Sequence, residues 1–210
     1  MKLGLGIITI PRRIGELPAD IKTSPETEVF VHNDTELRGV AYSRNECIKK
    51  LYDAGCDYIA LADDDMIYLK QNWFEDVVAA MDKHRRPYCC YPHTLGGGRT
   101  DLEGDIESWA QYIGAFYIMH RSVVEEVGYF SPKFKGYGFE DVHYKYRLEE
   151  CYGWHTNPKI LPYVLASEDV LGSNRRPSID NKEEQIKINR PIFEQEVKNG
   201  IRYYPYPDSQ

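Results

Sequence analysis

Three consecutive carboxylates, Asp63, Asp64 and Asp65, offer the clearest chemistry in this sequence. They directly follow the apolar run Tyr58–Ala62, whose length and flanking turn residues predict a buried strand. Because side chains alternate along a strand, we expect Asp63 and Asp65 on one side and Asp64 on the other. Two carboxylates on one side attract a cation, and hard oxygen ligands suit Mg²⁺ or Mn²⁺. A solvated acidic loop or a helix cap would show the same triplet, but open α/β sheets bind ligands where their strands end.

A second pair of acids, Glu140 and Asp141, closes the glycine-containing stretch Gly136–Asp141. The helical pattern of Val142–Glu150 follows at once, so both acids are expected at a helix N-terminus. The helix dipole favours negative charge there, which is a purely structural explanation. The chemical explanation is that the bent loop shapes a binding surface and that one acid serves as a general base. The residues alone leave both explanations open.

Two further polar side chains stand near predicted element ends. Asp34 follows the short strand Glu28–His32, where an acid can accept a hydrogen bond from a ribose or a base edge; a plain turn residue is the alternative. Arg44 lies in the stretch Ser43–Glu46, which has the form of a capping box at a helix start. It is suited to contact a phosphate or carboxylate, or to form a surface ion pair.

The elements that must position these residues alternate between strand and helix. Strands are predicted at 3–10, 28–32, 58–62, 88–91, 112–119 and 161–166. Helices are predicted from the Ser43 capping box to Gly55, after a cap at Asn72, from Ser122, over 142–150, and over 180–200 as one or two charged helices broken at Pro191. This alternation indicates an α/β fold with a mostly parallel central sheet flanked by helices.

Composition narrows the class of protein. The chain has 210 residues, 42% of them hydrophobic, which is enough for one sizeable core. Its formal net charge of −7 argues against a nucleic-acid partner, although a nucleic-acid acceptor is not excluded. The five cysteines form no Cys-x-x-Cys pair, so reduced, buried thiols are expected. No signal peptide or membrane-length apolar run is present, and a soluble, cytoplasmic protein is expected.

Taken together, the motifs resemble those of GT-A-fold glycosyltransferases. The first half is similar to glycosyltransferase family 2, in the helix start Ala41–Asn45 and the Asp-x-Asp strand end Asp63–Asp65. The second half is similar to the β-1,4-galactosyltransferase and polypeptide N-acetylgalactosaminyltransferase type, whose Gly-Trp-Gly-x-Glu-Asp motif matches Gly136–Asp141, with Arg147-Leu148 in the next helix. Tyr137 replaces the usual Trp of that motif. The resemblance implies a single, Rossmann-like GT-A domain.

The resemblance also implies a role for each site residue. The donor nucleotide would be held by Thr9, Asp34, Arg44, Asp63 and Asp64. The sugar or acceptor would contact Tyr137, Gly138 and Glu140, and Asp141 would be the catalytic base. The metal, Mn²⁺ or Mg²⁺, would be bound by Asp63 and Asp65. Where the family often places a metal-binding His, this chain has Glu168 and Asp169, which would complete an all-oxygen site.

The predicted function is therefore an inverting, metal-dependent transfer of a sugar from a nucleotide-sugar, expected to be a UDP-sugar, to a carbohydrate or other hydroxyl acceptor. Residues 1–179 would form the GT-A catalytic domain, and residues 180–210 a helical extension and tail packed on it. Two alternatives remain from the sequence: a non-catalytic nucleotide- or carbohydrate-binding module, and a sugar nucleotidyltransferase. The glycine-rich, lysine-containing loop typical of the latter does not follow the first strand.

Overall fold

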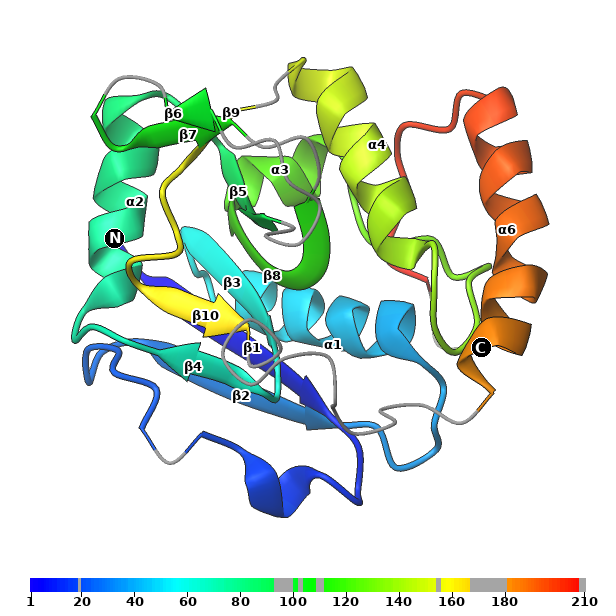
Figure 1. Cartoon of the computed structure of the whole chain (residues 1–210), viewed down its shortest axis with the longest axis horizontal. Helices are drawn as coiled ribbons and strands as arrows, with labels where there is room; N and C mark the ends of the chain where they lie inside the picture. The colour runs from blue at the N-terminus through cyan, green and yellow to red at the C-terminus, as the bar shows by residue number, and fades with distance from the viewer. Residues whose placement is uncertain are drawn as a thin grey trace.

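A five-stranded sheet, in the order β2-β1-β3-β8-β5, forms the centre of the computed structural model (Figure 1). β2 and β3 both run parallel to β1, whereas β8 runs antiparallel to its neighbours β3 and β5. The strands are β1 Leu3–Thr9, β2 Glu28–Asn33, β3 Tyr58–Asp63, β5 Tyr88–Pro92 and β8 Tyr112–His120. The structure describes residues 1–18, 20–92, 100–101, 104–108, 112–153, 156–166 and 181–207. The predicted mostly parallel sheet is confirmed, and the carboxyl ends of β1, β2 and β3 meet at one edge.

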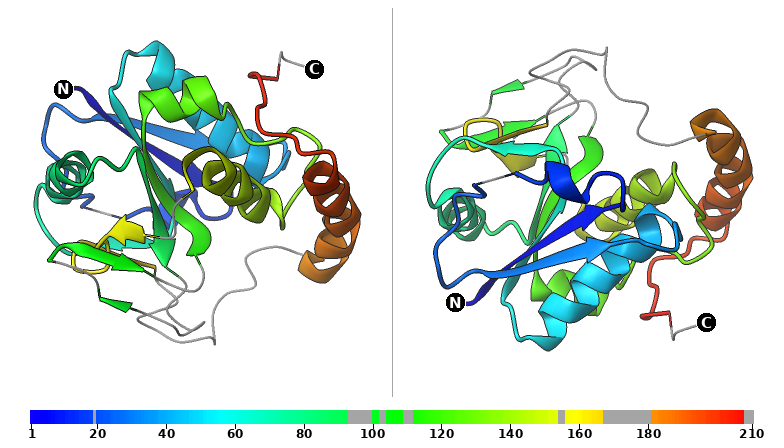
Figure 2. Two further views of the ribbon diagram at one scale, coloured as in Figure 1. Left: turned by 90° about the horizontal axis from the view of Figure 1, so that it is seen from above. Right: turned by 90° about the horizontal axis from the view of Figure 1, so that it is seen from below.

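Helices cover both faces of this sheet (Figure 2). One face packs on α2 (Trp73–Lys83), whose apolar residues join those of β1 and β3 in one core. The other face packs on α1 (Val40–Asp53), α3 (Arg121–Glu126) and α4 (Glu140–Tyr152) in a second core. Neighbouring residues such as Ala60 and Leu61 belong to opposite cores, as the pleat requires. Among the described helices, none is both long and apolar enough to cross a bilayer.

Two small sheets and one long helix complete the described chain. β4 (Met66–Tyr68) pairs with β10 (Val164–Ala166), and a three-stranded sheet combines β6 (Thr100–Asp101), β7 (Ile106–Ser108) and β9 (Thr156–Pro158). A single 3-10 turn, η1, spans Ile14–Glu16. The C-terminal helix α6 (Lys182–Lys198) lies outside α4 in all views, at the opposite side of the molecule from α2 (Figures 1 and 2).

The structure contradicts several of the predicted helix boundaries. α1 begins at Val40 with Gly39 as its N-cap, so the predicted capping box at Ser43 lies inside the helix. The N–H groups at this start are bound elsewhere: Gly39 donates to the Asp34 carboxylate and Val40 to the Gly136 carbonyl. Asn72 does occupy the N-cap of α2, but its side chain makes no capping hydrogen bond.

The C-terminal elements also differ from expectation. α4 begins at Glu140 rather than at residue 142, and β10 is shorter than the predicted strand over 161–166. The predicted break at Pro191 does not occur, because α6 continues through this residue. A proline inside a helix costs about 3 kcal/mol. Here the flanking Asn189 is fully buried and Phe193 packs on the core, so tertiary contacts hold both halves of α6 in one helix.

The cysteines follow the prediction with one exception. All five are free, and four of them, Cys47, Cys56, Cys89 and Cys90, are buried. Burial raises the pKa of the Cys47 thiol to about 12. Cys151 is exposed instead, because it lies in the last turn of α4. The expectation of buried thiols is therefore wrong for this residue.

Candidate active site

A cavity of about 810 Å³ opens where the parallel strands end. Its floor includes Thr9 from the end of β1, Asp34 after β2 and the triplet Asp63–Asp65 after β3. The facing wall comes from the start of β8 and from the N-terminus of α4, which supplies Glu140 and Asp141. The sheet therefore brings together both acidic motifs, although they are far apart in the sequence.

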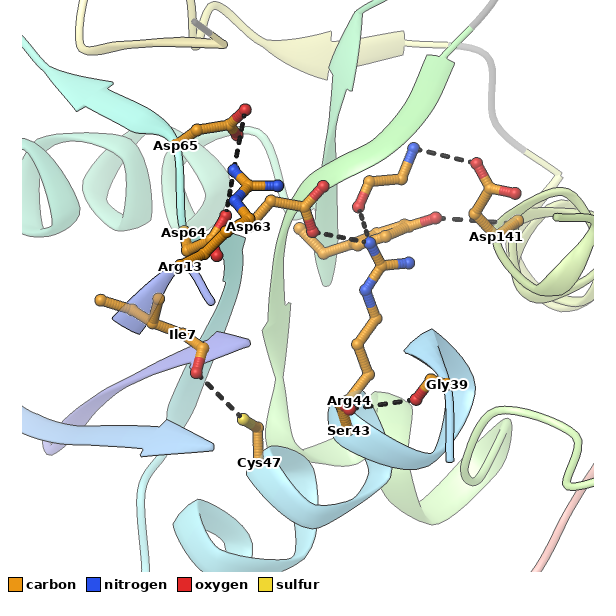
Figure 3. Close-up of polar contacts among 12 residues, drawn as sticks. Ile7, Arg13, Gly39, Ser43, Arg44, Cys47, Asp63, Asp64, Asp65 and Asp141 are labelled. Carbon is orange, nitrogen blue, oxygen red and sulfur yellow. Dashed lines mark hydrogen bonds and ion pairs between the residues drawn. The ribbon is translucent and has the colours of Figure 1, made fainter. Parts of the chain in front are cut away.

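The strand that leads into the acidic triplet does not continue through all three residues. Only Asp63 belongs to β3, while Asp64 and Asp65 form the turn into β4. Consequently Asp64 and Asp65 share one partner, Arg13, whose Nη2 contacts Asp64 Oδ1 and lies 3.3 Å from Asp65 Oδ2 (Figure 3). Asp64 is buried, and its Oδ2 accepts a hydrogen bond of 2.6 Å from Thr9 Oγ1. The predicted alternation thus fails beyond Asp63, because the backbone turns there.

Arg44 carries the positive charge closest to Asp63. Its guanidinium is buried, and its Nη2 donates to Asp63 Oδ1 at 3.0 Å and to the Gly114 carbonyl (Figure 3). Its Nη1 has no hydrogen-bond partner within the described part of the chain. Desolvation in the cavity, and to a smaller degree the Asp65 charge, raise the pKa of Asp63 to about 7 despite Arg44. The predicted surface alternative for Arg44 is wrong, because this side chain points into the cavity.

Asp34 is committed to the local backbone. Its Oδ1 accepts from the Arg38 N–H at 3.0 Å and its Oδ2 from the Gly39 N–H at 2.8 Å. The side chain is buried yet still lines the cavity. Asp34 therefore has the structural role that the sequence left open as an alternative, because its carboxylate fixes the turn at the start of α1.

The two acids of α4 have different surroundings. Asp141 is half-buried; its Oδ2 accepts from the Gly114 N–H at 3.1 Å and its Oδ1 from the Val142 N–H at 2.8 Å. Glu140 is buried, and within the described residues its Oε2 has no hydrogen-bond partner. Burial raises the pKa of Glu140, the adjacent Asp141 raises it further, and Arg44 opposes both. Asp141 is thus oriented by hydrogen bonds, whereas Glu140 keeps an unused acceptor in the cavity.

Of the other predicted acceptor-binding residues, one lines the cavity and one packs behind it against α6. Tyr137 lines the cavity, and Lys182 Nζ lies 4.4 Å from its ring centroid. Gly138 has a φ of 99° and faces α6, where a Cβ would lie 2.8 Å from Ile186 Cγ1. Glu168 and Asp169, the predicted additional metal ligands, lie outside the described residues.

Two residues that the sequence reasoning did not select hold this site together. Arg13 neutralises Asp64 and Asp65 from the loop after β1. Gly114 joins the two walls, because its carbonyl accepts from Arg44 and its N–H donates to Asp141 (Figure 3). A usable signal existed only for Gly114, since a glycine inside a strand often marks a close approach of another group.

A divalent cation fits the donor set only in part. Asp63 and Asp65 each use one carboxylate oxygen in the ion pairs that the structure gives them, and the charge of Asp65 contributes to the raised pKa of Asp63. Within the described ranges, no group of three His, Cys, Asp or Glu side chains is arranged to hold a metal. Mg²⁺ commonly binds through one or two carboxylates plus substrate phosphates, so Asp63 and Asp65 fit a site that a phosphate ligand completes.

Comparisons with known proteins identify the family of this chain. The profile of Glycosyl transferase family 2 matches residues 21–145, more than half of the chain. A search of curated proteins finds no match. Among solved structures, the fold is similar to that of GalNAc-T7 with UDP, GalNAc and Mn²⁺, with a TM-score of 0.52 and 12% identity over 72% of this chain and 41% of that one.

Two other solved structures match with lower scores. They are A197 from STIV, with a TM-score of 0.47 and 21% identity over 69% of this chain and 76% of that one, and S. aureus TarS 1–349 in complex with UDP, with a TM-score of 0.48 and 12% identity over 94% and 72%. The family match covers β2, α1, β3 and the Glu140–Asp141 pair, all of which contribute to the cavity, whereas β1 and Arg13 lie before the matched residues. The chain therefore belongs to glycosyl transferase family 2 and is a glycosyltransferase with the GT-A fold.

Proposed function

We propose that this protein transfers a sugar from a UDP-sugar to an acceptor hydroxyl, with inversion at the anomeric carbon. One observation carries the proposal: a single cavity has Arg13, Arg44 and the acidic triplet on one wall and Asp141 on the other. The first wall suits a nucleoside diphosphate and the second suits a hydroxyl that must lose a proton. GalNAc-T7 was solved with UDP, which supports UDP as the nucleotide here.

On the donor wall, the charges suit a leaving diphosphate. Arg44 keeps its Nη1 buried and unpartnered among the described residues, so a phosphate or ribose oxygen that reaches it after a small shift of the side chain can accept from it without displacing Asp63. Thr9, Asp63 and Asp64 shape the floor beneath the nucleotide, while Asp34 contributes through the start of α1. Negative charge develops on the diphosphate as the glycosidic bond breaks, and preorganised cations lower that barrier.

The donor wall also has the ligands for a divalent metal. Asp63 and Asp65 would hold Mn²⁺ or Mg²⁺ together with the donor phosphates, and Glu168 or Asp169 would add a further oxygen. When bound, such a metal would neutralise the charge that develops on the leaving diphosphate. The Mn²⁺ in the GalNAc-T7 structure supports this part of the proposal.

On the acceptor wall, Asp141 is the proposed general base. Its carboxylate is held in orientation by the N–H groups of Gly114 and Val142. The acceptor hydroxyl would give its proton to Asp141 while its oxygen bonds to the anomeric carbon and the diphosphate leaves with the bonding electron pair. One displacement assisted by one base inverts the anomeric centre. Tyr137 and Glu140 would contact the sugar or acceptor, with Gly138 shaping the loop between them.

The proposed organisation of the chain follows from the same contacts. We propose that residues 1–179 are the catalytic domain and that residues 180–210 are an extension packed on it. α6 contacts α4 and supplies Lys182 and Gln185 to the cavity wall, which supports this division. The acceptor class is a carbohydrate or another hydroxyl compound, and a cytoplasmic location stays a prediction.

The test measures nucleotide binding and sugar transfer separately. UDP at a hundredfold excess over its dissociation constant should add about 2.7 kcal/mol to the free energy of unfolding. We expect this in the presence of Mn²⁺, with loss of the gain in Asp65→Asn. Asp141→Asn should keep the gain but lose turnover of UDP-sugars. If UDP binds and no UDP-sugar turns over with any acceptor, the protein is a binding module. If a sugar phosphate and UTP yield a UDP-sugar, it is a nucleotidyltransferase.

A further inference from the structure

The segment 133–138 directly precedes Glu140 and Asp141, and it has no regular secondary structure apart from one isolated bridge. On one side it meets the start of α1, where Gly136 forms a bridge with Gly39 and its carbonyl accepts from the Val40 N–H at 2.9 Å. On the other side it meets α6. The position of the acids of α4 therefore depends on how tightly these two helices hold the segment.

Asn189 of α6 makes the central contacts. This side chain is fully buried, and its Nδ2 lies within hydrogen-bonding distance of three carbonyl oxygens: 2.9 Å from Lys135, 3.1 Å from Tyr137 and 3.0 Å from Gly138. Its Oδ1 accepts from the Lys135 N–H at 3.4 Å. Backbone groups of an irregular segment need partners where the fold shields them from water, and one amide here serves the Lys135 N–H and three carbonyl oxygens.

The fit around Asn189 is close. Gly136, with a φ of 63° that favours glycine, lies against the Gln185 amide: a Cβ would lie 2.3 Å from Gln185 Oε1. At one end of the contact, the ring of Phe139 stacks on Phe193 at a centroid distance of 5.2 Å. At the other end, Lys133 Nζ lies 2.6 Å from Oε1 of the buried Glu196. α6 thus contacts this part of the chain over about three helical turns, from Gln185 to Glu196.

The contacts with α6 hold Phe139 in an unfavourable backbone conformation. It is the N-cap of α4 and has a φ of 68°, a left-handed conformation that a bulky side chain rarely adopts. Such a conformation costs about 1–3 kcal/mol and persists only where the surroundings impose it. The next two residues are Glu140 and Asp141, so a relaxation of Phe139 would redirect both acids.

We propose that Asn189 is a positioning residue for the reaction, and that it acts on Asp141 through the segment 135–138. This inference rests on the proposed function of Asp141 as the base. It adds a role for α6, whose Lys182 and Gln185 already line the cavity beside Tyr137. Asn189 itself lies behind the segment and does not line the cavity.

The test replaces the amide with a carboxylate of the same shape. Asn189→Asp removes the Nδ2 donor and presents negative charge to three carbonyl oxygens. The matched control is Gln195→Glu, the same chemical change at an exposed position of α6, whose Nε2 donates to Asn199 Oδ1 at 2.7 Å. The probes are UDP with Mn²⁺ for binding, and UDP-glucose, UDP-galactose and UDP-N-acetylgalactosamine for turnover, including slow transfer to water.

We expect Asn189→Asp to lower kcat at least about tenfold, because small misplacement of a reacting group has large effects. The dissociation constant of UDP should stay within about threefold of the wild-type value. A role through Asp141 further predicts that Asn189→Asp causes no additional loss of kcat in the Asp141→Asn background. Gln195→Glu should change neither quantity.

Hydrogen exchange separates this proposal from the proposed function. Asn189→Asp should speed exchange of the amides at 135–142 and leave those of β1 and β3 unchanged. If exchange changes in this way but the wild type turns over no UDP-sugar, the positioning contact stands and the proposed function fails. Unchanged exchange and unchanged kcat in Asn189→Asp would overturn the proposal, as would equal loss of kcat in the Asp141→Asn background. Should Asn189→Asp fail to fold, Asn189→Ser, which keeps one hydroxyl donor, takes its place.

Discussion

Adding one methyl group at Gly114 should separate catalysis from nucleotide binding. The Cβ of Gly114→Ala would lie 2.5 Å from Asp141 Cβ and 2.9 Å from Asp141 Oδ2. It would also lie 2.9 Å from Arg44 Nη1. The guanidinium ends a long, flexible chain and can retreat. Asp141 Cβ is attached directly to the backbone of α4, so this contact requires the helix start to move.

The size of the effect follows from the contact distance. Carbon atoms pack at about 3.5–4.0 Å, so Asp141 must recede by about 1 Å. A misplacement of that size can cost about a hundredfold in rate. Overpacking should also lower the free energy of unfolding by about 1–3 kcal/mol. The assay is steady-state turnover of UDP-sugars, with UDP binding measured in parallel by calorimetry.

Gly15→Ala is the control for Gly114→Ala. A Cβ at Gly15 meets nothing within 4 Å, and its backbone φ is outside the left-handed region. This variant should keep both turnover and stability. A kcat of Gly114→Ala within about twofold of the wild type, in a folded protein, would refute the reasoning, because Asp141 would then tolerate the displacement.

Three further predictions concern the charges of the cavity. Arg13→Met should destabilise the metal-free protein by about 3 kcal/mol, because buried Asp64 loses its charged partner. Mn²⁺ should then raise the melting temperature of the variant more than that of the wild type. An equal rise in both proteins would contradict this prediction. Glu140→Gln should gain stability over the wild type as pH rises. Burial raises the pKa of Glu140 in the folded protein, so the stability that its protonated form contributes is present below the ordinary pKa of Glu and is lost as pH rises through the folded pKa. Urea unfolding should therefore give a different change in the free energy of unfolding for Glu140→Gln at pH 5 than at pH 9. Arg44→Lys should weaken UDP binding, because a Lys ammonium that replaces Nη2 against Asp63 and the Gly114 carbonyl leaves no second nitrogen in the place of Nη1 for the nucleotide; unchanged calorimetric affinity would exclude this role.

The positions of the two acidic motifs could be predicted because they follow from local patterns. A buried strand ending at Asp63 and a helix beginning beside Asp141 are encoded by short runs of neighbouring residues. The details of their ends could not be predicted so well. The start of α1 is decided by Asp34 and Gly136, and α6 runs through Pro191 because residues on both sides of it pack on the rest of the chain.

The sequence by itself determined the α/β fold class, the five strands of the central sheet and the acidic residues of the cavity. Tertiary structure alone decided their partners. Arg44 and Gly114 are 70 positions apart, Gly114 and Asp141 are 27 apart, and Asn189 is 51 to 54 positions from the segment that it holds. Side-chain periodicity reports which face of an element is buried, but it carries no information on which distant backbone group lies opposite. Those contacts arise only when the sheet brings its strand ends together, and they are the contacts that orient the acids.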